Sequence, residues 1–352
     1  MFEWIQQGIS EVAGFPFDSA KRVYGVYLLG TLLILAALAF WYRASRGREA
    51  AVEVLRAFFS PRIWLHRSAR LDYKMVVLNP MLQSLFAGLG GLSLVPVALW
   101  VSDGLSGFLG NVSFEWPTAW VTAAFTVALF TADDFSRFLL HWLMHKVPWL
   151  WSIHRLHHSA EVLTPLTVYR IHPVESFLYS LRMVLAQGVV LGVFFYGFGM
   201  RLSAWEIAGA NLFTYVFNFA GSNLRHSHVW LSFGPWLERI FISPAQHQIH
   251  HSNSPRHFDR NMGAFLAIWD ALFGTLTLAR GEKVDGFGLR KGEESPHGTV
   301  RSAYLEPAWH SLCTLGHGVG NTTKTAIRYC KSLSFKISFR SGTMNRFRKK
   351  EM

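Results

Sequence analysis

The long apolar stretches of this chain constrain its fold more than any other feature. A helix crosses the ~30 Å hydrocarbon core of a bilayer with about 20 apolar residues, and residues 23–42 supply twenty without a charge. Charged residues make up only 16% of the chain, against about 25% in soluble proteins, which is too few to cover a water-exposed surface. Further apolar stretches occupy residues 79–101, 117–132, 183–200 and 202–224. We therefore predict an all-α integral membrane protein with about four to five transmembrane helices.

The distribution of basic residues orients the predicted spans. Residues 43–74 hold eight Lys and Arg against three acids, whereas residues 102–116 hold no base and two acids. Because basic loops stay on the cytoplasmic side, we expect a multi-pass protein whose histidine-rich segments form a helical cap in the cytosol. We divide the chain into an N-terminal span with a basic loop (1–78), a central membrane domain (79–280) and a polar, basic C-terminal tail (281–352).

Histidines are unusually frequent and clustered in this chain. There are sixteen, and they include one His-x3-His pair and two His-x2-His-His groups. Two copies of the longer pattern have a chance probability below about 10⁻³. Residues three and four apart lie on one face of a helix, so each group presents its imidazoles together. The candidate metal ligands are His141, His145, His154, His157, His158, His172, His226, His228, His247, His250 and His251.

The number of histidines indicates more than one metal ion. A structural zinc site closes with four ligands, whereas three clusters that each offer two or three imidazoles suit two ions with an open position each. The two cysteines, Cys313 and Cys330, provide no thiolate site. Imidazole binds zinc, copper, iron and nickel, so ligand type leaves the metal open. So many neutral ligands beside lipid suggest a redox pair that activates dioxygen, and we expect two iron ions.

Two carboxylates are candidates to orient the ligating rings. Asp134 lies seven residues before His141, two helical turns back on the same face, and it is either an acceptor for a ligating imidazole or a helix-end carboxylate. Asp133 is a weaker candidate. Glu175, three residues after His172, is predicted to hold that ring.

These motifs resemble those of the fatty acid hydroxylase and sterol desaturase superfamily of membrane di-iron enzymes. The matching sequences are HWLMH, HRLHH, RIHPVE, RHSH and HQIHH, followed by DRNMGAFLAIWDALFGT at residues 259–275. The last run is similar to the family's Asn-aromatic-Gly…Trp-Asp-x-Leu-Phe-Gly-Thr signature, with Met262 in place of the aromatic residue. The resemblance covers residues 80–278 and implies a helical membrane base, a cytosolic cap, two irons and O2-dependent hydroxylation or desaturation of a lipid.

The resemblance also sorts the histidines. The ligand motifs of the family match the pair and both His-x2-His-His groups, His226 matches the family's single histidine, and His172 matches a His-Pro position that is a ligand or lies just outside the ligands. His228 stands where the family often has another polar residue. We expect His257 at the surface near the cap. The solitary histidines, which we expect to be solvated, are His66, His297, His310 and His317.

The leading hypothesis is therefore an enzyme that hydroxylates or desaturates a C–H bond of a lipid. No sequence feature indicates a Ser-His-Asp triad or nucleic-acid binding. A metal transporter would place its ligands at the bilayer midplane, and a haem-binding electron carrier would use two axial histidines per haem; both remain as alternatives. The chain shows no electron-transfer domain of its own, so we expect a separate donor, such as a ferredoxin or a b-type cytochrome system.

Overall fold

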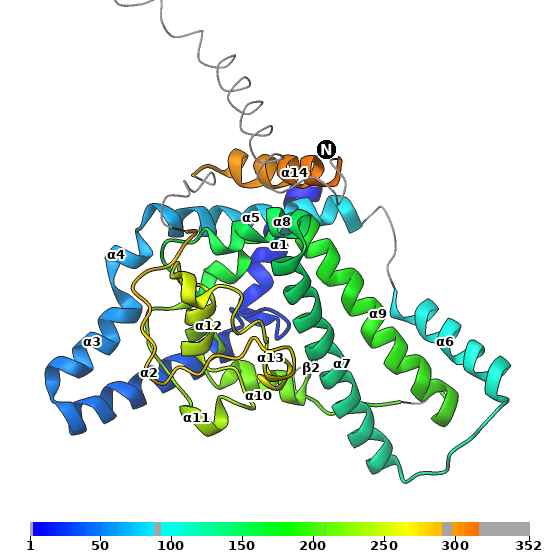
Figure 1. The fold of residues 1–352 in the computed structure, drawn as a ribbon. Helices are drawn as coiled ribbons and strands as arrows, with labels where there is room; N and C mark the ends of the chain where they lie inside the picture. The colour runs from blue at the N-terminus through cyan, green and yellow to red at the C-terminus, as the bar shows by residue number, and fades with distance from the viewer. Residues whose placement is uncertain (1–2, 88–92, 201, 208, 291–297, 317–352) are drawn as a thin grey trace, which may run out of the picture.

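The structure is a computed structural model that describes residues 3–87, 93–200, 202–207, 209–290 and 298–316. The described residues are mostly helical (Figure 1), and the predicted all-α class is corrected only by a two-stranded antiparallel hairpin. The long and medium helices are α1 (Glu3–Gly14), α2 (Gly25–Arg46), α3 (Arg48–Phe59), α5 (Arg67–Ala87), α6 (Leu94–Leu109), α7 (Thr118–Lys146), α8 (Pro148–His158), α9 (Pro173–Phe198) and α14 (Val300–Gly316). The shorter elements are α4 (Pro61–Trp64), β1 (Glu206–Ile207), β2 (Ala210–Asn211), α10 (Leu212–Phe219), α11 (Gly234–Leu237), α12 (Pro244–His250), α13 (Ile268–Leu272) and the 3-10 turns η1 (Phe15–Phe17), η2 (Pro165–Tyr169), η3 (Ser222–His226) and η4 (Pro255–His257).

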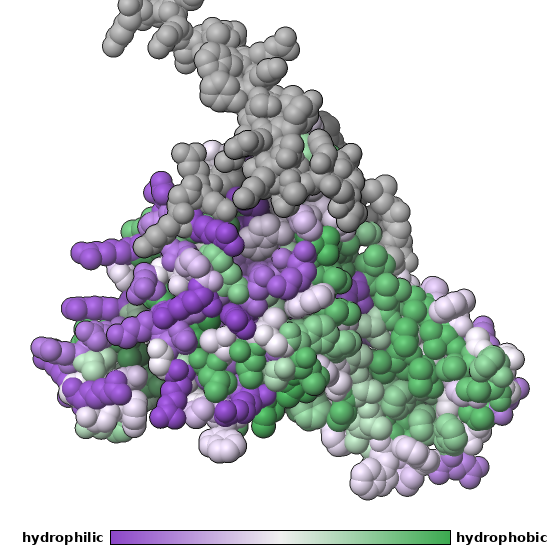
Figure 2. All heavy atoms as spheres, in the orientation of Figure 1, coloured by the Kyte–Doolittle hydropathy of each residue, from purple (hydrophilic) through white to green (hydrophobic). Residues whose placement is uncertain are grey.

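Two of the described helices, α2 and α9, are long and apolar enough to cross a membrane. The shorter apolar helix α6 packs along α9 (Figure 1), and small residues allow the approach. A Cβ atom on Gly192 would lie 2.5 Å from the carbonyl oxygen of Ala98, so only glycine fits there. Figure 2 shows apolar residues gathered over the region of α6, α7 and α9, and polar residues over the opposite part of the molecule. Such a divided surface is expected of a membrane protein.

Two of the predicted spans are wrong in their form. Residues 79–101 do not make one continuous helix, because Ser93 is extended and its side chain caps the first turn of α6, which begins at Leu94. Residues 202–224 form the β-hairpin, the eight-residue α10 and η3. Gly209, with φ +81°, permits the tight turn of that hairpin, and the Asn211 side chain starts α10 by accepting from the Phe213 amide.

The other predicted spans lie inside longer helices. Residues 118–132 form the first half of α7, which is 29 residues long and ends at Lys146, and Pro117 is its N-cap. Residues 183–198 form the second part of α9, which begins ten residues earlier at Pro173. The total number of spans, the cytoplasmic side and the domain division stay predictions.

A buried ion pair ties α5 to η2, the turn that follows α8. Arg170 and Asp72 are 1% and 0% exposed, and the Nε–Oδ1 distance is 2.5 Å. Thr167 donates to the other carboxylate oxygen of Asp72, so α5 is pinned to η2. Nearby, α14 packs on α5 and α8 through Ala303 and Leu156. Within the predicted tail, α14 is thus a packed helix, and residues 317–352, with most of the tail's basic residues, lie outside the described residues.

Candidate metal centre

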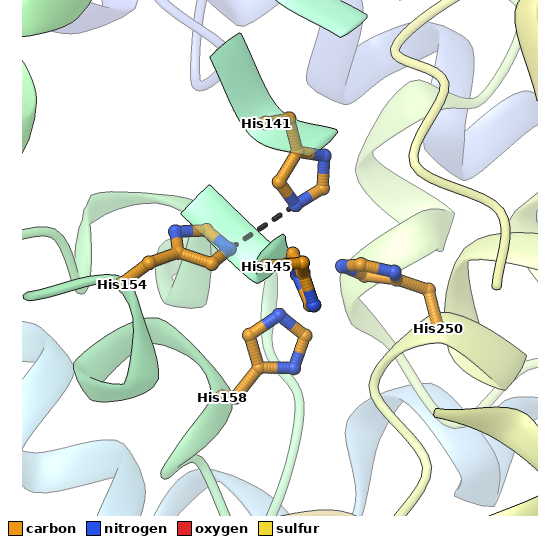
Figure 3. A group of neighbouring side chains, drawn as sticks. All are labelled: His141, His145, His154, His158 and His250. Atoms are coloured by element: carbon orange, nitrogen blue, oxygen red, sulfur yellow. Dashed lines mark hydrogen bonds between the residues drawn. The ribbon is translucent and has the colours of Figure 1, made fainter. Parts of the chain in front are cut away.

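Nine of the eleven predicted ligands lie together in two groups. In the first group the five ligand nitrogens lie within 4.8 Å of one another, and Figure 3 shows the rings converging on a common space. Helix α7 supplies two of these rings, α8 supplies two and α12 supplies one. The first group is His141, His145, His154, His158 and His250, and the second is His157, His226, His247 and His251.

Each His-x2-His-His motif divides between the two groups. In α8, His154 and His158 face the first group while His157 faces the second. In α12 the assignment is reversed, since His247 and His251 face the second group and His250 faces the first. The two groups are therefore adjacent, and the rings of His158 and His251 stack at 4.7 Å between them. Local sequence fixes these short helices: Pro148 begins α8, and Ser243 and Gln246 form a capping box at the start of α12.

The ring nitrogens fit metal ions. Around an ion with ligands at about 2.1 Å, neighbouring nitrogens lie about 3.0 Å apart in octahedral and about 3.4 Å apart in tetrahedral geometry. The Nε2 atom of His226 lies 3.4 Å from Nε2 of His157 and 3.1 Å from Nε2 of His247. The Nε2 atoms of His141 and His154 are 3.1 Å apart. The Nε2 atoms that are buried and have no hydrogen-bond partner belong to His145, His158 and His250.

Burial favours the neutral form of eight grouped imidazoles by lowering their pKa, and the neutral form is the one that binds metal. Desolvation lowers the pKa of His226 to about 3 and that of His250 to about 3. Burial and the neighbouring imidazoles also lower the pKa of His141, His145, His157, His158, His247 and His251 well below the usual value. At neutral pH their lone pairs are free to coordinate.

The backbone of residues 259–263 orients two rings of the first group. The Nδ1 atom of His141 lies 2.7 Å from the carbonyl oxygen of Met262, and that of His250 lies 2.8 Å from the carbonyl oxygen of Arg260. Each carbonyl accepts a hydrogen bond from Nδ1–H, so the proton stays on Nδ1 and Nε2 keeps the lone pair that faces the group. Asn261, between them, has φ +55° and is buried.

Side chains from the signature run hold this loop in place. The carboxylate of Asp270 accepts from the backbone amides of Met262 and Gly263 at 2.7 and 2.8 Å. A Cβ atom on Gly263 would lie 2.8 Å from that same carboxylate, so a larger residue would displace Asp270 and break these hydrogen bonds. Asn261 bonds through its side chain to the backbone of Gln246 and Thr277.

Both predicted carboxylate partners are corrected. Asp134 contacts no ligating ring, because its two oxygens accept from the amides of Phe265 and Leu266 and from the Trp269 indole, at 2.9, 3.0 and 2.9 Å. It supports the signature run from the other side. Glu175 holds His154 rather than His172, with 2.8 Å between Oε1 and Nδ1.

Two predicted ligands lie outside both groups. His172 caps α9, where its Nδ1 accepts from the Val174 amide and its Nε2 bonds to the Tyr304 carbonyl. The Nε2 of His228 accepts from the Leu163 amide at 3.2 Å. The ring nitrogens of both histidines thus form hydrogen bonds with backbone groups, and these bonds hold the rings away from the two groups.

The solitary histidines differ from the prediction as well. His257 is 1% exposed rather than at the surface, and it bonds to Glu282 at 3.0 Å. His66 and His310 are half-buried. His297 and His317 lie outside the described residues.

Sequence reasoning missed one side chain beside the first group. The Asp259 carboxylate lies 3.3 Å from Nδ1 of His145 and also binds Lys146. Its position at the start of the signature run was the available signal.

Two cavities lie near the centre. One, of about 240 Å3, is lined by His145, His158 and His250 of the first group together with Asp259 and Arg290. The other, of about 550 Å3, is almost wholly apolar and lies beside α10 and α11. A cavity of that size and character suits a hydrocarbon chain.

Comparison with known proteins identifies the family. Residues 126–275 match the sequence model named "Fatty acid hydroxylase". The chain is 25% identical to an alkylglycerol monooxygenase of Caenorhabditis elegans over 57% of this chain and 34% of the relative. It is 32% identical to the ornithine lipid hydroxylase OlsE of Rhizobium tropici, over 46% of this chain and 45% of the relative. It is 29% identical to a Delta(7)-sterol 5(6)-desaturase of Eremothecium gossypii, over 42% of this chain and 35% of the relative.

The chain thus spans between 34% and 45% of the length of these three relatives. No solved structure matches it. The relatives are all oxidoreductases of one superfamily, and the matched region contains all nine grouped histidines. The resemblance predicted from the motifs is confirmed: residues 126–275 form a fatty acid hydroxylase domain, and these relatives belong to the fatty acid hydroxylase and sterol desaturase superfamily.

Proposed function

We propose that this protein hydroxylates or desaturates a C–H bond of a lipid, using O2, two iron ions and electrons from a separate donor. The observation that carries the proposal is the pair of adjacent, buried histidine groups inside a fatty acid hydroxylase domain. The names of the relatives, two hydroxylating enzymes and one desaturase, support a lipid as the substrate. The apolar surface and the two long apolar helices support a substrate that enters from the bilayer.

The chain's own residues would hold the metal and fix its ligands. The first group offers five nitrogens and the second offers four, so each ion would keep a position for another ligand. When bound, iron would supply the binding and reduction of O2. Glu175 and the carbonyls of Arg260 and Met262 keep the Nδ1 protons of three rings in place, and burial excludes water from the site.

The alternatives fit the geometry less well. Five ligand atoms within 4.8 Å of one another leave no space for a porphyrin between axial rings, which argues against a haem carrier. A transporter needs ligands along a path through the spans. These groups instead lie on α8, α12, η3 and the C-terminal end of α7.

Metal analysis and isotope labelling together test the proposal. We expect two irons per chain after anaerobic purification, and 18O from 18O2 in a lipid product, or a loss of two hydrogens from it, once a chemical reductant is added. A matched pair of variants makes the test specific. His158→Ala, within the first group, should abolish product formation, whereas His66→Ala, outside both groups, should not. A single tightly held zinc, or no oxidised lipid from iron-loaded protein, would refute the proposal.

A further inference from the structure

The apolar cavity beside α10 and α11 has an exposed rim and a buried floor. Val216 and Leu237 on the rim are 54% and 51% exposed. On the floor, Ile242 is 0% exposed and Arg225 is 5% exposed. Both polar residues that line this cavity, Arg225 and Ser222, are buried and lie at its deep end.

Arg225 is buried at that floor with hydrogen-bond donors that are not satisfied by the described residues. Its Nε and Nη2 atoms are buried without a hydrogen-bond partner, and its guanidinium rests on the rings of Phe217 and Phe265, 4.5 and 5.8 Å from their centroids. Within the described part of the chain no carboxylate forms an ion pair with it. A buried cation with unsatisfied donors and no ion pair is costly, and a ligand that supplies an acceptor to these donors would offset that cost.

The surroundings of Arg225 add a second positive charge, Arg22, and one carboxylate, Asp134, which is already hydrogen-bonded elsewhere. Arg22 lies over the same Phe265 ring, 5.5 Å from its centroid, and bonds to the neutral Asn218 side chain. Both oxygens of Asp134 are taken by donors of the signature run. Two cations thus share one ring at the floor of an apolar cavity.

We propose that this cavity binds a lipid with an oxyanion in its head group, a carboxylate or a phosphate, and that Arg225 binds this oxyanion. The hydrocarbon chain then lies along α10 toward the exposed rim. Since Arg225 immediately precedes His226 of the second group, the head group enters first, and the carbons near it lie closest to the metal centre. The last consequence rests on the proposed function, whereas the binding itself does not.

Binding to the purified full-length protein, without reductant so that no turnover occurs, tests the site. The probes are two pairs with matched chains: oleate against oleyl alcohol, and oleoyl lysophosphatidic acid against monooleoylglycerol. Dissociation constants are measured by native mass spectrometry. Charge-assisted hydrogen bonds of this kind correspond to a preference of about 10- to 100-fold for the anionic member of a pair. If the protein prefers the anion only in the first pair, the head group that it binds is a carboxylate. If it prefers the anion only in the second pair, the head group is a phosphate.

Two variants assign the preference to one residue. Arg225→Met keeps the length of the side chain and removes its charge, so the preference should vanish while binding of the uncharged probes is retained. Arg239→Met, which removes an exposed arginine beside Trp236 just beyond α11, should leave the preference unchanged. Equal binding of charged and uncharged probes by the unmodified protein would overturn the proposal, even if Arg225→Met fails to fold. So would a preference that survives in Arg225→Met.

Product analysis separates this inference from the proposed function. If the protein oxidises lipids but shows no preference for anions, the function stands and the head-group site is wrong. If anions bind through Arg225 but no lipid is oxidised, the site stands and the function is wrong. Oxygen placed near the head group, rather than near the methyl end, is the expected pattern when both hold.

Discussion

Glu175 offers the sharpest test of how the first histidine group is organised. Its carboxylate is 1% exposed and accepts from Nδ1 of His154 at 2.8 Å, while its second oxygen has no partner. Glu175→Gln keeps the size of the side chain and an acceptor oxygen but removes the charge. A charge-assisted hydrogen bond contributes about 1.5–3 kcal/mol and a neutral one about 0.5–1.5 kcal/mol. The difference of about 1–1.5 kcal/mol predicts iron affinity about 5- to 10-fold weaker.

Glu175→Ala removes the acceptor altogether. Loss of a partner that orients a metal-bound imidazole typically costs 10- to 100-fold in affinity, so the order of affinity should be the unmodified protein, then Gln, then Ala. The assay is anaerobic competition for Fe(II) against a chromogenic chelator. Glu161→Gln is the matched control, because that carboxylate binds Arg67 away from both groups. Unchanged iron affinity in Glu175→Ala would refute the reasoning, since it would mean that His154 needs no orienting acceptor.

Three further predictions follow from burial and charge. Asp72→Ala leaves Arg170 buried without its partner and should lower the free energy of unfolding by about 3–5 kcal/mol, measured by denaturant titration. The folded-state pKa of about 3 for His226 and for His250 lies below the unfolded value of about 6.5, so the unfolded chain binds more protons below pH 6.5. The metal-free protein should therefore lose about 2 kcal/mol per ring between pH 6.5 and pH 5, seen as a falling Tm, and constant stability would contradict it. His228→Ala should retain both irons by metal analysis, because that ring lies outside both groups.

Helical geometry explains why the clusters could be predicted, and also how they divide. Successive residues of an α-helix turn by about 100°, so positions i and i+4 lie about 40° apart and i+3 lies about 60° to the other side. His154 and His158 therefore share the first group, and His157 is turned toward the second. We predicted the shared face from spacing, but the side on which the second group lies depends on α12, a neighbour distant in sequence.

The partners of the carboxylates could not be predicted from local spacing. Asp134 was paired with His141 because the two share a helix face, yet its hydrogen bonds reach a segment 131 to 135 residues away. Glu175 lies close in sequence to His172, but His172 is used as the cap of α9. The prediction of a transmembrane span at residues 202–224 was wrong for a related reason, because contacts distant in sequence decide the path of the chain. The hydropathy of this stretch suits a span, whereas Gly209 and the contacts of Trp205 and Asn211 with α7 turn the chain back.

The signature run shows how residues that never touch a metal can determine its ligand geometry. Asp134 on α7 and Asp270, within the run on α13, accept five hydrogen bonds from backbone and indole N–H groups of the run. These bonds fix the carbonyls of residues 260 and 262, which set the tautomer and the direction of His250 and His141. The first group takes rings from three helices, and packing alone leaves each ring free to turn about its own bonds. The hydrogen bonds of the run restrict His141, His250 and His145, and Glu175 restricts His154, so four of the five rings can be preorganised before any metal binds.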